Sequence, residues 1–278
     1  MIWSAKHQDS KIYLWTSPTI DMQIPNMPFS RVLRAEVLKT RRTRGLFLAL
    51  TGPLVVTLIV TGFFIDGAHQ ANPAVDPWKG FIRYHANFFM LLYPLFAALV
   101  GFMLSNIEHK NNGFKNIFTQ PAPKGSFYFS KVLILLSWLG LSLLVSLGFL
   151  WLAGYLLGFV FPDYAFAKYA LPANTWAFYF RLFVALISIV AIHFFLSLYF
   201  DNFIVAVGSA VFLVIFGAIA VRHESGWLLP YTHSVQAYID FLGGDVKYVD
   251  KRIWISLGYG AFFFLAGYAL VARKNISS

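Results

Sequence analysis

Six long apolar runs constrain this chain more than any other feature of its sequence. Each holds about 20 residues with few charges, the length at which a helix crosses a hydrocarbon core about 30 Å thick. The runs cover residues 45–65, 84–105, 130–161, 176–199, 203–221 and 253–272. They predict an all-α integral membrane protein with six transmembrane helices in one domain, residues 45–278.

Composition supports the same class. The chain is 58% hydrophobic and only 12% charged, whereas soluble domains carry about 25% charged residues. The third run is too long for one perpendicular crossing at about 1.5 Å per residue. We therefore expect it to tilt or to project beyond one face of the membrane.

The distribution of lysine and arginine predicts the orientation of the spans. Basic residues precede the first span, follow the second and follow the last, where they include Arg44, Lys110, Lys131 and Arg273. Basic residues on the opposite side are offset by seven acids. Because cytoplasmic loops are rich in lysine and arginine, we expect a multi-pass protein of the cell (inner) membrane with both termini cytoplasmic. We therefore attribute the net charge of +10 to the basic cytoplasmic segments and their contact with lipid headgroups, and not to nucleic-acid binding.

The segment before the first span divides into two parts. Residues 1–28 are polar, hold three prolines and no apolar core of a secretory signal, and predict a poorly ordered extension. The start at Met1 and a start at Met27 both remain open. Residues 29–44 predict an amphipathic helix lying in the headgroup region, capped by Ser30.

The apolar stripe of this interfacial helix is expected to consist of Phe29, Val32, Leu33 and Val37. Glu36 falls within the stripe, where it pairs either with a basic residue of this chain or with a partner.

Sequence signals of catalysis and of metal binding are absent. The chain has no cysteine, and its seven histidines show no i, i+3 or i, i+4 pair. It contains no GxSxG, no HExxH and no Gly-Lys dipeptide, so it has no Walker A loop. His193 alone lies inside a span, as a functional group or as a neutral histidine hydrogen-bonded to a neighbouring helix.

The polar loop between the second and third spans, residues 105–131, is longer than a membrane turn requires. A short helix is expected from Gly113 to Thr119, ended by the prolines that follow. Phe114, Ile117 and Phe118 fall at i, i+3 and i+4 and form one apolar edge on it. Such an edge fits a groove in a partner protein, or it lies back on the membrane surface.

These features resemble a known family. A basic amphipathic helix with Glu36-x-x-Lys39 followed by six spans resembles the permease subunits of ABC-2-type exporters. The loop is similar to that of lantibiotic-immunity-like permeases. The residues that carry this similarity are Glu108, Asn112-Gly113-Phe114-Lys115-Asn116-Ile117-Phe118-Thr119, Pro121 and Ser130-Lys131.

The resemblance implies a transport subunit that is not itself an enzyme. It implies ATPase-coupling residues in the loop and a second contact at the next cytoplasmic turn: Glu108, Asn112, Phe114, Lys115, Ile117, Phe118, Asp201 and Asn202. The interfacial helix would contribute Glu36, Lys39, Arg41 and Arg42. ATP and Mg would be bound by a partner ABC ATPase, and no cofactor by this chain.

The expected function is export of a peptide, antibiotic or lipid-like substrate across the cell membrane. The expected partners are the ATPase, a second copy or a related permease subunit, and membrane lipids. Two alternatives are an ion-coupled secondary carrier and a membrane-embedded lipid-modifying enzyme. The first is weakened because the runs hold no acidic residue, and the second has only Asp76, Arg83 and His85 as a candidate polar group.

Overall fold

The computed structural model describes residues 27–41, 44–66, 74–110, 122–200, 202–244 and 246–273. Among them, six helices are long and apolar enough to cross a membrane, which confirms the predicted six-span, all-helical class. They are α2 (Arg44–Asp66), α3 (Pro77–Lys110), α5 (Lys124–Val160), α6 (Asn174–Ser197), α7 (Phe203–Ala220) and α9 (Lys251–Arg273). Two shorter helices are α1 (Phe29–Thr40) and α8 (Thr232–Leu242). Single turns of 3-10 helix are η2 (Pro162–Tyr164), η3 (Phe166–Lys168) and η4 (Gly226–Leu228).

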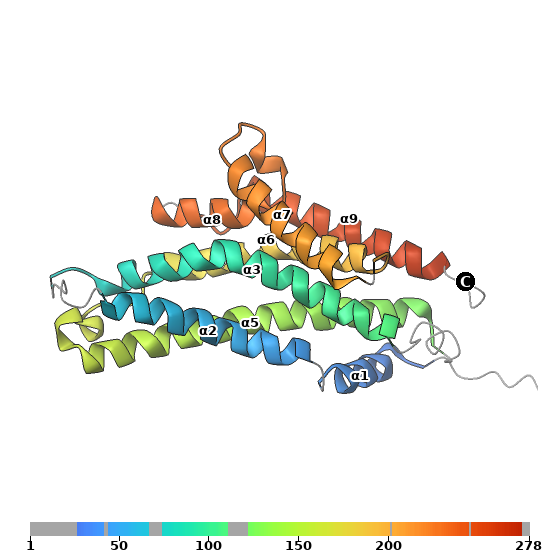
Figure 1. Cartoon of the computed structure of the whole chain (residues 1–278), viewed down its shortest axis with the longest axis horizontal. Helices are drawn as coiled ribbons and strands as arrows, with labels where there is room; N and C mark the ends of the chain where they lie inside the picture. Colours follow the sequence, from blue (N-terminus) through green and yellow to red (C-terminus); the bar gives the residue numbers. More distant parts are fainter. Residues whose placement is uncertain are drawn as a thin grey trace, which may run out of the picture.

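The long helices run side by side along the molecule, with α1 at the end where α9 and the C-terminus lie (Figure 1). The most extensive packing is between α6 and α9, between α3 and α6, and between α2 and α5. The third span, α5, has 37 residues, which at about 1.5 Å per residue exceeds the thickness of the hydrocarbon core. The expected long third helix is thus present.

Small residues let these helices approach closely. A side chain at Gly154 of α5 would overlap the ring of Trp78, and one at Gly158 would come within 2.9 Å of Phe166. Such positions allow tight contact between helices in lipid, where packing drives association.

Hydroxyl groups add interhelical hydrogen bonds to this packing. Tyr93 donates to the carbonyl of Ser142 over 3.2 Å, and Ser146 lies 3.1 Å from the Tyr179 hydroxyl. The serines of α5 therefore join it to α3 and to α6.

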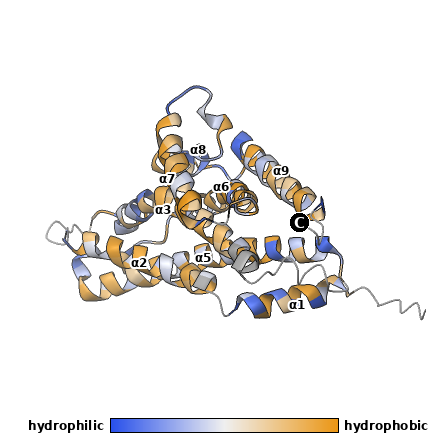
Figure 2. Ribbon diagram, turned by 45° about the vertical axis from the view of Figure 1, so that its right-hand side comes forward, coloured by the Kyte–Doolittle hydropathy of each residue, from blue (hydrophilic) through white to orange (hydrophobic). Residues whose placement is uncertain are grey.

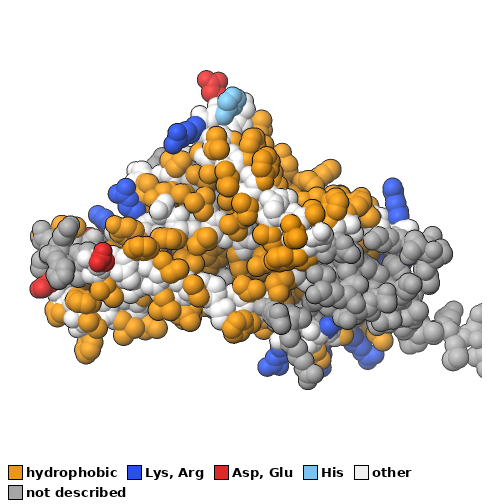
Figure 3. Space-filling model, in the orientation of Figure 1, with side chains coloured by type: hydrophobic (Ala, Val, Ile, Leu, Met, Phe, Trp, Pro, Cys, Tyr) orange, Lys and Arg blue, Asp and Glu red, His pale blue; other side chains and the backbone are white. Residues whose placement is uncertain are grey.

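The outside of the bundle is apolar, as a lipid-facing surface requires (Figures 2 and 3). Large side chains are exposed along several spans: Phe47 on α2, Phe159 on α5, Phe212 on α7 and Phe262 on α9 are each 65–85% exposed. In water such a surface would aggregate, whereas hydrocarbon solvates it. The exposed face thus agrees with a multi-pass membrane protein.

Between α7 and α9 the chain turns back toward the bundle. Tyr231, which precedes α8, places its hydroxyl 2.8 Å from Nε2 of His193 on α6. A side chain at Gly217 of α7 would come within 2.6 Å of the Tyr231 carbonyl oxygen. His193 thus has the structural hydrogen bond that was one of its two expected roles, and this contact anchors the start of α8 against α6 and α7.

Details of α1 differ from the prediction. The helix begins at Phe29 with Pro28 as its N-cap, so the expectation that Ser30 caps it is wrong. The buried face consists of Val32, Glu36 and Thr40, while Phe29 and Val37 are exposed. The buried face of α1 is the one that contacts α5. This face includes Glu36, which pairs with Lys131, and an apolar stripe alone does not predict such a pair.

Candidate coupling site at the α1 end

The site at the α1 end begins with a buried ion pair. Glu36 of α1 and Lys131 of α5 form a salt bridge in which each residue is about 95% buried. The two residues belong to the two sequence motifs that define this end of the chain, Glu36-x-x-Lys39 and Ser130-Lys131. Of the two partners expected for Glu36, the structure therefore provides the one within this chain.

Local contacts hold Glu36 in place. The hydroxyl of Thr40 donates to the carbonyl of Glu36 over 2.8 Å, and Lys39 Nζ lies 4.0 Å from the other carboxylate oxygen. One turn before Glu36, Val32 packs against Phe127 of α5 and against Ala122. Apolar contact and charge pairing together fix α1 on the first turns of α5.

The cost of separating this pair is large. Removing one member of a buried ion pair typically costs about 3–5 kcal/mol, since the other charge is left without compensation. The ion pair and the contact between Val32 and Phe127 therefore hold α1 against α5. The polar loop joins α3, which ends at Lys110, to α5, which begins at Lys124, so the second end of that loop leads directly into this unit.

Further contacts tie the same end of the bundle together. Ser105 of α3 donates to the carbonyl of Ser197 over 3.1 Å, and Lys124 of α5 donates to the carbonyl of Ala272 over 3.1 Å. The Tyr128 hydroxyl donates to the carbonyl of Phe264 over 2.7 Å. The start of α5 is thus hydrogen-bonded to α9, and α3 near its end is hydrogen-bonded to the end of α6.

The predicted site residues are only partly within the described structure. Glu36, Lys39 and Arg41 lie in or directly after α1, and Glu108 lies in the last turn of α3. Asn202 is the N-cap of α7, its side-chain oxygen accepting from the Ile204 amide over 2.8 Å. The remaining predicted residues lie outside the described residues: Arg42, Asn112, Phe114, Lys115, Ile117, Phe118 and Asp201.

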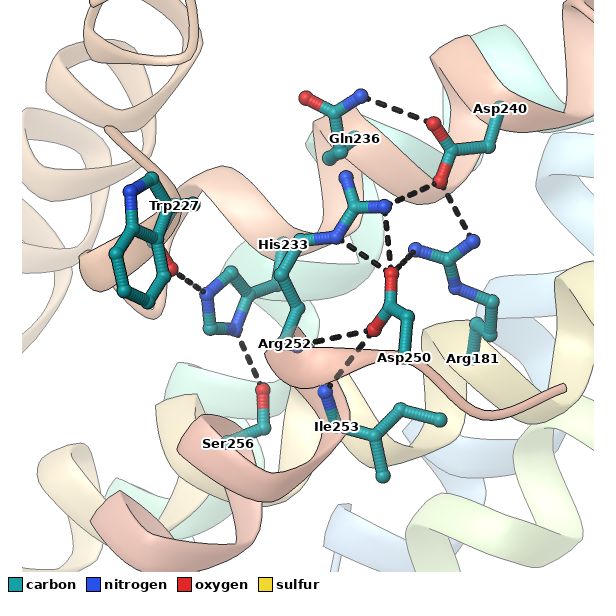
Figure 4. A network of polar contacts seen from close by, with 9 residues as sticks. All are labelled: Arg181, Trp227, His233, Gln236, Asp240, Asp250, Arg252, Ile253 and Ser256. Carbon is teal, nitrogen blue, oxygen red and sulfur yellow. Dashed lines mark hydrogen bonds and ion pairs between the residues drawn. The ribbon is translucent and has the colours of Figure 1, made fainter. Parts of the chain in front are cut away.

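A second polar cluster joins α6, α8 and the start of α9 (Figure 4). Arg181 of α6 donates to Asp240 over 2.6 Å and to Asp250 over 2.8 Å. Arg252 bonds the same two carboxylates, so two cations and two anions form a closed network. The sequence pattern places these residues only among the charges on the side opposite the cytoplasm, and it does not predict that they converge.

Electrostatics of this cluster favour its ionised form. Burial alone would raise the pKa of Asp250, but the hydrogen bond from Arg252 and the charge of Arg181 outweigh burial and hold it below 3.8. Beside the cluster, burial lowers the pKa of His233 below its usual 6.5. His233 is held by Ser256 at 2.6 Å and by the Trp227 carbonyl at 2.8 Å, so it joins α8 to α9.

The candidate polar group of the lipid-modifying-enzyme alternative does not converge on a site. Asp76 caps α3 by accepting from the Trp78 amide over 3.0 Å. His85 is buried between the Phe81 carbonyl and the Thr57 hydroxyl, each 3.3 Å away. Both residues have structural partners, and within the described ranges no group of three or more His, Asp or Glu residues is placed to hold a metal ion.

Six apolar spans, an α1 helix packed on α5 and an internal charge cluster define a polytopic membrane protein. A family model described as ABC-2 family transporter protein matches residues 32–217. The chain belongs to that family. The match begins in α1 and covers the ion pair and the loop between α3 and α5. Neither the curated proteins nor the solved structures contain a significant match.

Proposed function

We propose that this permease subunit works as an exporter, moving a peptide, antibiotic or lipid-like substrate out of the cell with energy from a separate ABC ATPase. The family supplies the transport class and the association with an ATPase. The direction of transport and the substrate class are our proposal. The six apolar runs of the sequence hold no acidic residue, and this suits an amphipathic substrate better than an ion.

The observation that carries the proposal is the buried Glu36–Lys131 pair. It joins the interfacial helix to the span that begins directly after the polar loop. If closure of an ATPase dimer pushes the helix that the sequence predicts at residues 113–119, we expect α1 and α5 to move together and α9 to follow through Lys124 and Tyr128. ATP and Mg would be bound in the ATPase, and the membrane path would be enclosed with a second copy or a related permease.

The proposal is tested by affinity purification of the tagged protein from native membranes in mild detergent, with mass spectrometry of bound proteins. Wild type should recover an ATPase with a Walker A motif, and the Phe114→Ala, Phe118→Ala double variant should lose it. The matched control is Phe159→Ala with Phe180→Ala, because these exposed phenylalanines belong to α5 and α6 outside the loop. Retention of the ATPase by the loop variant, or no ATPase with any variant, would overturn the proposed coupling site.

A further inference from the structure

A groove between α2 and α5 has no role in the coupling just described. It has a volume of about 250 Å³. Its walls are α2 residues Leu54, Thr57, Leu58, Thr61 and Ile65, α5 residues Phe149, Leu152, Ala153, Leu156, Leu157 and Val160, and Phe161 directly after α5. On α2 these positions repeat every three or four residues, so they occupy one face of the helix.

The chemistry of the walls is that of hydrocarbon. Only two wall residues carry polar side chains, and neither hydroxyl is available. The Thr57 hydroxyl is paired with Nε2 of His85 behind the groove, and the Thr61 oxygen is buried within the protein, without a hydrogen-bond partner there. A ligand of this groove therefore gains from apolar contact and from no hydrogen bond.

The groove opens sideways to the membrane. Leu58, Leu152 and Val160 on its rim are each more than half exposed, and the surface over α2 and α5 is covered by hydrophobic side chains (Figure 3). Water is not stable in such a cavity, because the walls offer too few hydrogen-bond partners. The surrounding solvent that can fill it is the hydrocarbon of the bilayer.

The length of the groove matches one leaflet. From Leu54 to Ile65 is eleven residues, about 16 Å along a helix, and half of a hydrocarbon core is about 15 Å. The groove ends near Asp66, the last residue of α2, and so runs from that end of the bundle toward the membrane midplane.

We propose that this groove binds a single acyl chain of a membrane lipid from the leaflet on the Asp66 side. The chain lies along α2 and α5 with its carboxyl end near Ile65 and Val160 and its methyl end near Leu54 and Phe149. This binding site is independent of the coupling to an ATPase, so either proposal can fail without the other.

Photo-cross-linking in vesicles tests the site on the full-length protein. Phosphatidylcholine carrying a diazirine near the carboxyl end of one acyl chain should label peptides around Ile65 and Val160. The same lipid with the diazirine near the methyl end should label peptides around Leu54 and Phe149. Equal labelling of all lipid-facing helices with both probes would overturn the proposal.

A variant whose groove is filled by a larger side chain provides a second test. Ala153→Trp places an indole in the groove and should reduce labelling of its walls at least fivefold, whereas Leu144→Trp, on the exposed face of α5 outside the groove, should leave labelling unchanged. Melting temperatures of both variants establish that each is folded. Cross-links between two Leu156→Cys chains, with no lipid label in the groove, would assign the groove to a second copy and contradict the lipid proposal.

Discussion

At the scale of single residues, two charge clusters fix where helices meet. Glu36 sits in a stripe that should be apolar, and its position makes sense once Lys131 lies opposite it. The chain brings them together across 95 residues of sequence, a distance at which a helical pattern carries no information about pairing. The sequence therefore predicted that Glu36 needed a partner, and only the structure identified which one.

The Glu36–Lys131 pair should behave as a coupled unit in a double-mutant cycle. Glu36→Leu alone and Lys131→Met alone should each lower the free energy of unfolding by about 3–5 kcal/mol, because each leaves one buried charge uncompensated. The free energy of unfolding of the double variant should fall much less, since two apolar side chains replace the ion pair. Thermal unfolding in detergent measures all four proteins, and additive losses in the double variant would show that the pair is not coupled.

The cluster around Asp250 should make stability depend on pH. Its folded-state pKa lies below 3.8, so it contributes stability that is present above that value and is lost as pH falls through the folded pKa. The melting temperature of wild type should therefore drop between pH 5 and pH 3 by more than that of Asp250→Asn. Parallel curves for the two proteins would contradict this role of Asp250.

At the scale of helices, the apolar runs predicted every span, but two features needed the structure. α3 begins at Pro77 and α5 at Lys124, earlier than the apolar runs, because aromatic side chains in these first turns, among them Trp78, Phe127 and Tyr128, are buried against the bundle. α8 was not predicted, since its 11 residues mix apolar and polar types and are too short for a span. Its partners, Arg181 and Arg252, come from elements distant in sequence.

Glycines on α7 offer a matched test of this packing. A methyl group at Gly217 would lie 2.6 Å from Tyr231, so Gly217→Ala should push the start of α8 away and destabilise the protein by about 1–3 kcal/mol. Gly208→Ala has nothing within 4 Å and should be neutral or slightly stabilising, because alanine favours a helix. Equal melting temperatures for the two variants would disprove the close contact at Gly217.

At the scale of the molecule, the sequence predicted the class and the family, whereas the coupling role of every predicted site residue remains a prediction. Six apolar runs and the two motifs sufficed to identify an ABC-2 permease, a class that the family match establishes. The loop residues Asn112 to Phe118 lie outside the described structure, so their docking role rests on the apolar edge and the resemblance. The charge network around Arg181 could not be predicted, because its acidic partners Asp240 and Asp250 lie in segments distant from Arg181 in sequence.

Topology can be measured directly because the chain has no cysteine. Tyr248→Cys, at an exposed position between α8 and α9, should react with a membrane-impermeant maleimide on intact cells. Leu38→Cys, exposed on α1, should react only after the membrane is opened. The reverse labelling pattern would place α1 and both termini outside the cell.

The most direct test of the central claim is whether an ATPase contacts the loop next to the α1–α5 unit. Single cysteines at Lys115 and at Tyr248 would be treated with a short photoactivatable cross-linker in native membranes, with and without ATP. If the loop is the coupling site, position 115 should cross-link to a Walker-motif ATPase with a yield that changes when ATP is added, and position 248 should give no such cross-link. An ATPase cross-linked equally at both positions, or at neither, would contradict this role of the loop.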